Sequence, residues 1–102
     1  WMAGDLQVAR EVQVMEEVVV RIGRNGAVAD GPAEVREAID YGAAETVIVA
    51  DALVRENRTS KIIEDAERLG AGVVVLSTAF EPGKRLAGLG GVAALLRYKI
   101  AT

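Results

Sequence analysis

The sequence predicts an α/β fold, a three-layer α/β/α sandwich with a small mixed sheet in its middle layer. Three short apolar runs have the length of strands, at residues 46–50, 72–77 and 92–96. Segments with helical periodicity separate them, and this alternation is typical of a sheet covered by helices. The last run, VAALL, has no polar face, so it predicts a central strand that is covered on both sides. At 102 residues, the chain is expected to form a single domain.

The N-terminal segment predicts one amphipathic helix. Asp5 is the expected N-cap, and the glycines and asparagine of residues 23–26 are expected to end the helix. Glu11 falls off the apolar stripe and is expected in solvent. The predicted buried face consists of apolar residues spaced three or four positions apart: Val8, Val12, Met15, Val19 and Ile22.

A short connection and a second helix come next. Residues 27–30 form either a plain connection or an edge strand. Pro32 suits the first position of a helix, and Glu34 lies near the positive end of the helix dipole. The predicted buried face of this helix is Val35, Ala38 and Ile39.

The second half alternates strands and helices. The β-branched run at residues 46–50 predicts a buried strand, and residues 72–77 predict a second one. Thr59 or Ser60 is expected to cap the helix between them, which Gly70 ends. Its predicted inner face is Ile62, Ile63, Ala66 and Leu69, with Glu64 and Asp65 on the solvated face. Pro82 is expected to begin a short helix that runs to Leu89, before the final strand.

Two residue types that carry much enzyme chemistry are absent. Without cysteine, the chain has no disulfide, no thiolate nucleophile and no zinc–cysteine site. Without histidine, it lacks the usual general base and the commonest metal ligand. We therefore expect no catalytic residue, no metal and no cofactor. No apolar run approaches the roughly 20 residues that cross a bilayer, so no membrane partner is expected.

The glycines of residues 88–91 and the polar residues Asp51 and Ser77 are candidate ligand sites. The GLGG of residues 88–91 could cradle phosphate, but dinucleotide loops need strand, glycines and helix, and here the predicted order is helix, glycines and strand. Asp51 and Ser77 follow strands, where open α/β sheets bind ligands. They either contact a cation or nucleotide or bond to the loop backbone. The second interpretation is favoured because Asp and Ser commonly do this after strands.

The charged residues point to a partner of another kind. The formal net charge of −3 argues against a strongly basic nucleic-acid binder. Basic residues nevertheless gather in two places, with Arg55 and Arg58 in one loop and Lys84 and Arg85 near the C-terminus. No aromatic residue interleaves with either pair, so stacking on bases is unsupported. We predict that these four side chains bind a partner with an acidic protein or ribonucleoprotein surface.

Two segments resemble the same known family. Residues 41–53, YGAAETVIVADAL, resemble a stretch of Pelota proteins and class-I translation termination factors. Residues 81–98, EPGKRLAGLGGVAALLRY, resemble the end of the same domain, and the similarity runs from about residue 12 to residue 100. Both segments occur in the expected order and spacing. The chain therefore resembles the C-terminal domain of archaeal Pelota proteins.

The resemblance implies a fold and a role. The fold would be that of kink-turn-binding ribosomal proteins, with a four-stranded mixed sheet. The role would be a non-enzymatic protein-docking domain, part of a longer cytoplasmic factor that acts in stalled-ribosome rescue and mRNA surveillance. The implied partners are a translational GTPase of the elongation-factor type, an ABC-type ribosome-recycling ATPase and, through the full-length protein, the ribosome.

Two related functions are alternatives. Class-I termination factors typically carry an inserted minidomain, and the loops at residues 52–60 and 77–83 are too short for one. Kink-turn RNA-binding proteins open their RNA-contacting helix with Gly-x-Asn-Glu, whereas this chain has Gly31, Pro32, Ala33 and Glu34. Ala33 lacks the amide that would bond to base edges, and Pro32 lacks a backbone donor. These departures argue against direct RNA binding by this domain.

Overall fold

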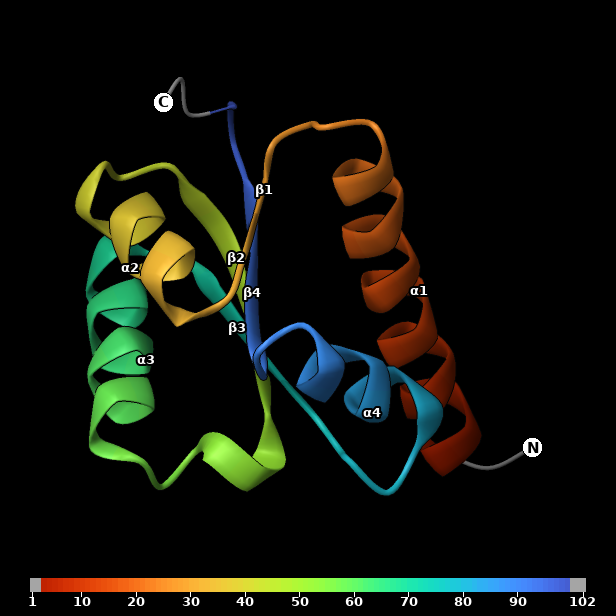
Figure 1. The fold of residues 1–102 in the computed structure, drawn as a ribbon. Coiled ribbons are helices and arrows are strands. Elements are labelled where there is room, and N and C mark those ends of the chain that lie inside the picture. Colours follow the sequence, from red (N-terminus) through yellow and green to blue (C-terminus); the bar gives the residue numbers. More distant parts are fainter. Residues whose placement is uncertain (1–2, 100–102) are drawn as a thin grey trace.

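The computed structural model describes the backbone of residues 3–99 and the side chains of residues 10–99. The elements are α1 (Ala3–Gly23), β1 (Val28–Asp30), α2 (Pro32–Asp40), β2 (Ala44–Ala50), the 3-10 turn η1 (Asp51–Leu53), α3 (Asn57–Leu69), β3 (Gly72–Leu76), α4 (Glu81–Gly88) and β4 (Val92–Leu96). Helices α2 and α3 cover one face of the sheet, and α1 and α4 cover the other (Figure 1). The predicted three-layer sandwich is confirmed.

The sheet is small and mixed, with the strand order β1-β4-β2-β3. Strand β4 runs antiparallel to both of its neighbours, and β2 runs parallel to β3. All five residues of β4 are buried. Ala93 and Leu95 face the α1 and α4 layer, while Ala94 and Leu96 face the α2 and α3 layer. The prediction of a central strand covered on both sides is confirmed.

The buried face of α1 differs from the prediction. Met15 is buried as predicted, and Ile22 is partly buried against the same core cluster. Val12 and Val19, however, are 37% and 40% exposed, and Val18 is buried in their place. This helix is rich in valine and carries two apolar stripes, so its periodicity alone cannot select the stripe that meets the sheet. Val8, which was also predicted on this face, lies outside the described side chains.

Two polar expectations for α1 were also wrong. Asp5 lies inside the helix, which already begins at Ala3, so it is not the N-cap. Glu11 is buried instead of solvated, and its Oε1 accepts the backbone N–H of Ser77 at 3.2 Å. This bond satisfies a backbone donor that follows the last residue of β3, and it ties α1 to that end of the strand.

A second side chain fastens α1 to the opposite end of the sheet. Arg21 pairs with Glu17 at 2.7 Å and donates from Nη1 to the carbonyl oxygens of Ala27 at 3.0 Å and Leu96 at 3.2 Å. It therefore joins the helix to the chain before β1 and to the end of β4. The helix ends at Gly23 as predicted, and Asn25 in the following turn has a positive φ of 53°.

Strand β1 and helix α2 follow the prediction. Residues 28–30 form an edge strand, and Pro32 is the first residue of α2. The buried residues of α2 are the three predicted ones, Val35, Ala38 and Ile39. Glu34 reaches back along the helix, and its Oε2 accepts the backbone N–H of Asp30 at 3.0 Å.

Helix α3 begins earlier than predicted. Its first residue is Asn57, so neither Thr59 nor Ser60 is the cap, and the side chain of Thr59 is buried in the first turn. Gly70 is the C-cap, as predicted, in the left-handed region with φ of 88°. Of the predicted inner face, Ile62 and Ala66 are buried and Ile63 is partly buried, but Leu69 is 38% exposed. Leu69 lies in the last turn and borders the surface depression between α2 and α3.

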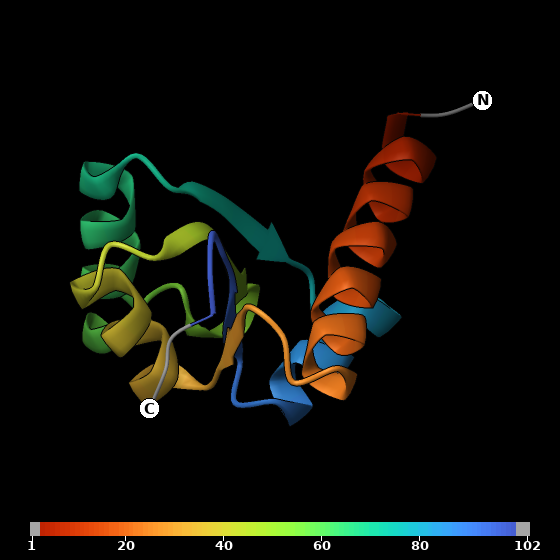
Figure 2. The same ribbon diagram turned by 90° about the horizontal axis from the view of Figure 1, so that it is seen from above.

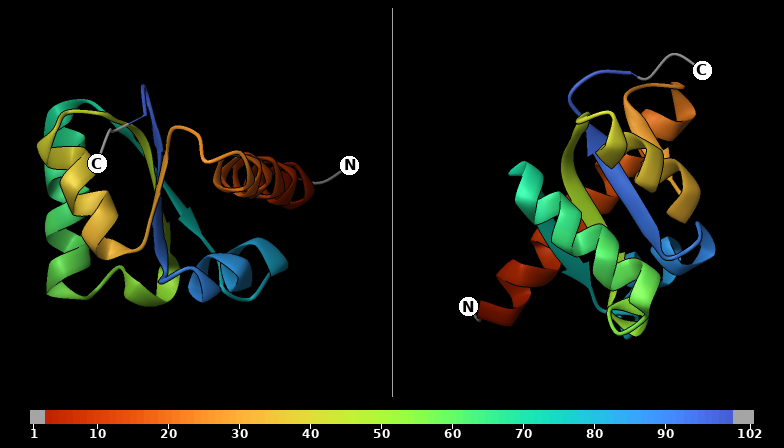
Figure 3. Two further views of the ribbon diagram at one scale, coloured as in Figure 1. Left: turned by 45° about the horizontal axis from the view of Figure 1, so that its top comes forward. Right: turned by 90° about the vertical axis from the view of Figure 1, so that its left-hand side faces the viewer.

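Strand β3 is an edge strand and not a buried one, which corrects the prediction. Among residues 3–99 it pairs only with β2, and its burial is incomplete, with Val75 43% exposed. Figure 3 shows no strand beyond it. The sequence of β3 is as apolar as that of a buried strand. A five-residue segment does not indicate whether its strand lies in the middle or at the edge of a sheet, so the sequence could not predict this position.

Helix α4 is short and tightly packed against the loop before it. It begins at Glu81, with Pro82 second, and ends at Gly88, one residue before the predicted end at Leu89. Gly83 is buried against the backbone of Ser77 and Thr78. None of the helices within residues 3–99 combines the length and the apolar character that a membrane crossing requires.

Candidate functional site

The four predicted partner-binding residues lie in two groups. Arg55 precedes α3 and Arg58 lies in its first turn, whereas Lys84 and Arg85 belong to α4 on the opposite face of the sheet (Figure 1). Both groups stand toward the end of the sheet where β2 and β3 finish. All four side chains are exposed, and within residues 10–99 none of them forms an ion pair. The fold therefore presents four unneutralised cations at one end.

Asp51 and the residues after β3 bond to each other. Asp51 Oδ1 accepts the hydroxyl of Thr78 at 2.8 Å and the backbone N–H of Thr78 at 3.1 Å. Ser77 Oγ accepts the backbone N–H of Ala79 at 3.2 Å. These contacts match the favoured interpretation, in which both side chains stabilise loops. Within the described part of the chain, no group of three acidic side chains is arranged to hold a metal ion.

The glycine joint after α4 has the wrong geometry for a phosphate cradle. The backbone N–H of Gly91 donates to the carbonyl of Leu86 at 2.9 Å, and that of Gly90 donates to Ala87 at 3.2 Å. Both amides thus cap the last turn of α4 and are already occupied. Gly90 and Gly91 have positive φ values of 105° and 83°, which turn the chain directly into β4.

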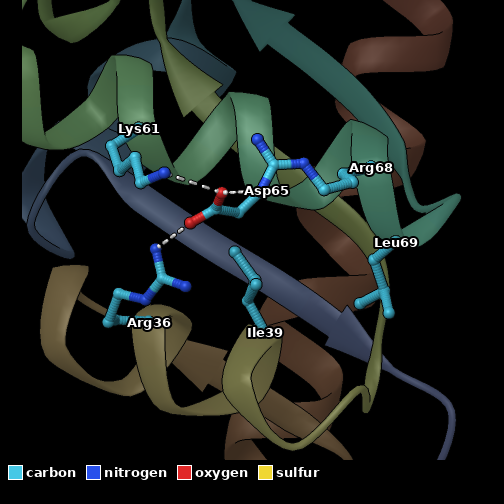
Figure 4. A pocket seen from close by; sticks show the side chains of 6 residues that line it. All are labelled: Arg36, Ile39, Lys61, Asp65, Arg68 and Leu69. Atoms are coloured by element: carbon cyan, nitrogen blue, oxygen red, sulfur yellow. Dashed lines mark hydrogen bonds and ion pairs between the residues drawn. The ribbon is translucent and has the colours of Figure 1, made fainter.

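A cluster that sequence reasoning missed joins α2 to α3. Arg36 pairs with Asp65 at 2.7 Å across the two helices, and Lys61 and Arg68 approach the same carboxylate at 3.2 Å and 3.5 Å. Arg36 also pairs with Asp40 at 2.7 Å. Figure 4 shows these side chains converging on Asp65. The side chain of Asp65 is only 13% exposed, which corrects the expectation that it lies on a solvated face.

The cluster borders a shallow depression of about 410 Å³, which is lined by Arg36, Ile39, Lys61, Asp65, Arg68 and Leu69. Its three cations already bond to carboxylates, so the arrangement serves to hold α2 against α3. The i,i+4 spacings of Arg36 with Asp40 and of Lys61 with Asp65 are visible in the sequence. The bond that joins the two helices, between Arg36 and Asp65, connects residues 29 positions apart, so no local spacing in the sequence indicates it.

Acid is expected to destabilise the domain through two carboxylates. The hydroxyl and N–H of Thr78 hold the pKa of Asp51 below its ordinary value of 3.8, and Arg36 together with Lys61 lowers the pKa of Asp65. Their stabilisation is therefore present above the ordinary pKa and is lost as the pH falls through the lowered value. Urea unfolding measured from pH 7 downward should show a decline below about pH 4 that is smaller in Asp51→Asn and Asp65→Asn.

Asp30 provides the opposite control. Its burial, with the neighbouring Glu34 carboxyl, raises the pKa of Asp30. Protonation of Asp30 therefore favours the folded state as the pH falls, and Asp30→Asn should make the acid decline of stability steeper. An unchanged pH profile in all three variants would show that these carboxylates do not set the acid sensitivity.

The start of α2 agrees with the argument against kink-turn recognition. Ala33 is exposed and offers no hydrogen-bonding group, and Pro32 has no N–H to donate. The N–H of Gly31 donates to the carbonyl of Val92 at 2.9 Å, so it is occupied within the fold. The first turn of α2 thus lacks the side-chain amide that base edges would require, and its first residue supplies no backbone donor.

Comparisons with known proteins agree on one family. The family model of eRF1 domain 3 matches residues 8–100. A Pelota homologue from Methanocorpusculum labreanum is 70% identical over 97% of this chain. The chain spans 29% of the length of that protein.

Solved structures give the same answer. Pelota from Archaeoglobus fulgidus superposes with a TM-score of 0.91 and 40% identity, covering 97% of this chain and 32% of that one. A model of ribosome-bound archaeal Pelota and ABCE1 superposes with a TM-score of 0.79 and 42% identity, covering 92% of this chain and 28% of that one.

A more distant structure is that of Dom34 from S. cerevisiae, a translation termination-like factor involved in RNA quality control pathways and interacting with Hbs1. It gives a TM-score of 0.82 and 26% identity over 90% of this chain and 28% of that one. The predicted resemblance and the predicted fold are both confirmed. The chain belongs to the eRF1 domain 3 family, with archaeal Pelota proteins among its relatives.

Proposed function

We propose that this chain is a protein-docking domain of a Pelota-type factor that acts in stalled-ribosome rescue and mRNA surveillance in the cytoplasm. The observation that carries the proposal is the 42% identity, over 92% of this chain, with archaeal Pelota bound to the ribosome together with ABCE1. The 29% share of the M. labreanum protein supports a further inference, that residues 1–102 act as one domain of a longer factor.

The proposed partners are an ABC-type recycling ATPase, a translational GTPase of the elongation-factor type and, through the full-length protein, the ribosome. Support comes from ABCE1 in the archaeal complex and from the interaction of yeast Dom34 with Hbs1. A docking role also fits the local chemistry, because Asp51, the possible cation contact, already accepts two hydrogen bonds from Thr78. Arg55, Arg58, Lys84 and Arg85 are the proposed contact residues, because they are exposed and unneutralised among the described residues.

Charge reversal at the proposed contacts is expected to weaken partner capture. The tagged chain, alone and within a full-length Pelota protein, is mixed with the archaeal GTPase and the recycling ATPase, and bound protein is quantified. The double variants Arg55→Glu/Arg58→Glu and Lys84→Glu/Arg85→Glu should each reduce capture of at least one partner by about tenfold at low salt. Reversing exposed rim charges mainly slows association, so the loss should shrink as salt is added.

The matched control is Arg24→Glu/Arg97→Glu, which reverses two exposed cations outside the proposed contacts. Capture by this variant should stay near the wild-type level. Failure to capture either partner, both in the full-length protein and with this chain alone, would count against the docking function. Tight, salt-sensitive binding of a kink-turn RNA by this chain would favour the ribosomal-type alternative instead.

A further inference from the structure

The two edges of the sheet are protected to different degrees. Strand β1 has three residues and is followed directly by Pro32. The N–H of Asp30 at its end donates to Glu34, and Arg21 occupies the carbonyl of Ala27 just before it. Short length, proline and charged side chains are the devices by which natural sheets prevent further strands from pairing. The β1 edge is therefore closed.

The β3 edge carries none of these devices. Its five residues are one glycine, three valines and one leucine, and it pairs with β2 in a continuous parallel register from Gly72 to Leu76. Within the described residues, no group outside the β2 ladder bonds to the backbone of Val73, Val74 or Val75. In a parallel pair, alternate residues direct N–H and C=O groups away from the partner strand, so β3 presents open donors and acceptors.

The helices on either side of the sheet extend along this edge. The first turns of α1 project past β3 on one face of the sheet, and α3 flanks it on the other (Figures 2 and 3). Val75, on the α3 side, is 43% exposed although its neighbour Val49 in the ladder is fully buried. An extra strand beside β3 would therefore cover Val75 and would lie next to the first turns of α1.

We infer that the β3 edge binds an extended segment of a partner protein as a fifth strand, with apolar side chains beside Val75 and acidic side chains at the end where β3 finishes. The open backbone groups select an extended chain. Arg55 and Arg58 stand at the finishing end of β2 and β3 and form no ion pair within the described residues, so they select acidic residues there. This inference rests on the docking function proposed above and names the kind of segment that docks.

A second copy of this chain fits the edge less well. If two copies paired β3 to β3 in antiparallel fashion, about a twofold axis perpendicular to the sheet, the projecting turns of both α1 helices would lie on the same face and approach the shared seam (Figure 2). A single strand meets only one α1. RNA is also disfavoured, because the open edge offers backbone groups and valines and has no aromatic side chain for stacking.

The test uses two labelled peptides, EETVTVTV and TVTVTVEE, which place the acids at either end of an alternating segment. Fluorescence anisotropy measures binding, and amide hydrogen exchange locates it. One of the two peptides should bind more tightly and should slow exchange at alternate amides of residues 73–75. The control peptide EETVPVTV should bind less well because its proline removes a donor from the added strand.

Two variants of matched exposure test the location. Val75→Lys places a charge on the open edge and should weaken peptide binding about tenfold or more. Val19→Lys makes the same change at a residue that is 40% exposed on α1, and peptide binding should be unchanged. Arg55→Glu/Arg58→Glu should weaken binding of EETVTVTV but not of TTTVTVTV, in which threonine replaces both acids.

Three results would overturn the inference. The first is amide exchange in β3 that stays unchanged with peptide at about 1 mM, the weak end of specific binding. The second is an equal loss of peptide affinity in Val75→Lys and Val19→Lys, and the third is slowed exchange of β3 amides in a dimer of this chain without peptide. Capture of the GTPase and ATPase separates this inference from the proposed function. If capture persists while the peptide fails to bind, only the β3 inference falls. If the peptide binds while neither partner is captured, only the proposed function falls.

Discussion

Gly83→Ala should destabilise the domain by about 2 kcal/mol or more, although alanine is the better helix former by about 1 kcal/mol. Gly83 lies in the first turn of α4, and an added Cβ would overlap the carbonyl oxygen of Ser77 and crowd the N–H of Thr78. Both obstacles are backbone atoms, so no side chain can rotate away. The loop after β3 or the whole of α4 would have to move.

Gly88→Ala, in the last turn of the same helix, is the matched control. No atom outside the helix lies within 4 Å of its Cβ position, so the usual preference for alanine should make the change neutral or slightly stabilising. Thermal unfolding of both variants measures the contrast, with an expected fall in Tm of roughly 10 °C or more for Gly83→Ala. Equal Tm values for the two variants would show that the loop yields easily to α4.

Ile62→Ala should cost about 3 kcal/mol of stability. Ile62 is 1% exposed and packs in the core between α3 and the sheet, together with Val47 and Val92. Truncation removes most of a buried side chain and leaves a cavity that the short strands around it cannot fill by collapsing. Urea unfolding of the variant measures the loss as a shift of the midpoint at constant slope.

Leu69→Ala is the comparison that decides between the sequence pattern and the structure. The helical period places Leu69 on the same face as Ile62, but its 38% exposure predicts a cost of about 1 kcal/mol or less. Ile62→Val, which removes one methylene, should cost about 1 kcal/mol, well below the cost of Ile62→Ala. Equal costs for the two alanine variants would mean that Leu69 is packed as the period suggests.

Most of the architecture could be predicted because its signals are local. The VAALL run of β4 has no polar side chain, so burial on both faces follows from its composition alone. Pro32 and Gly70 mark the limits of α2 and α3 through their backbone preferences. Alternation of such elements leads to a helix-covered sheet, and two motifs in the right order led to the family.

The missed features depend on contacts between distant segments. The angle at which α1 crosses the sheet decides which of its apolar residues are buried. The order of strands in the sheet decides that β3 lies at an edge. The hydrophobic periodicity of a single segment reports neither of these. Asp65 has the spacing of a solvated residue, yet Arg36 from another helix covers it. The four candidate contact cations were visible in the sequence, but their placement on opposite layers required the fold.

The position of β4 has a consequence for the order of folding during synthesis. The strand made last lies between β1 and β2, and its pairing with β1 joins residues 65 or so positions apart, Val28 to Leu95 among them. Until β4 is in place, β1 has no neighbour to bond to, and one side of β2 stays open. The nascent chain can therefore join β1 to β2 only after residues 92–96 are available, so the middle of this sheet is the last part of it to form.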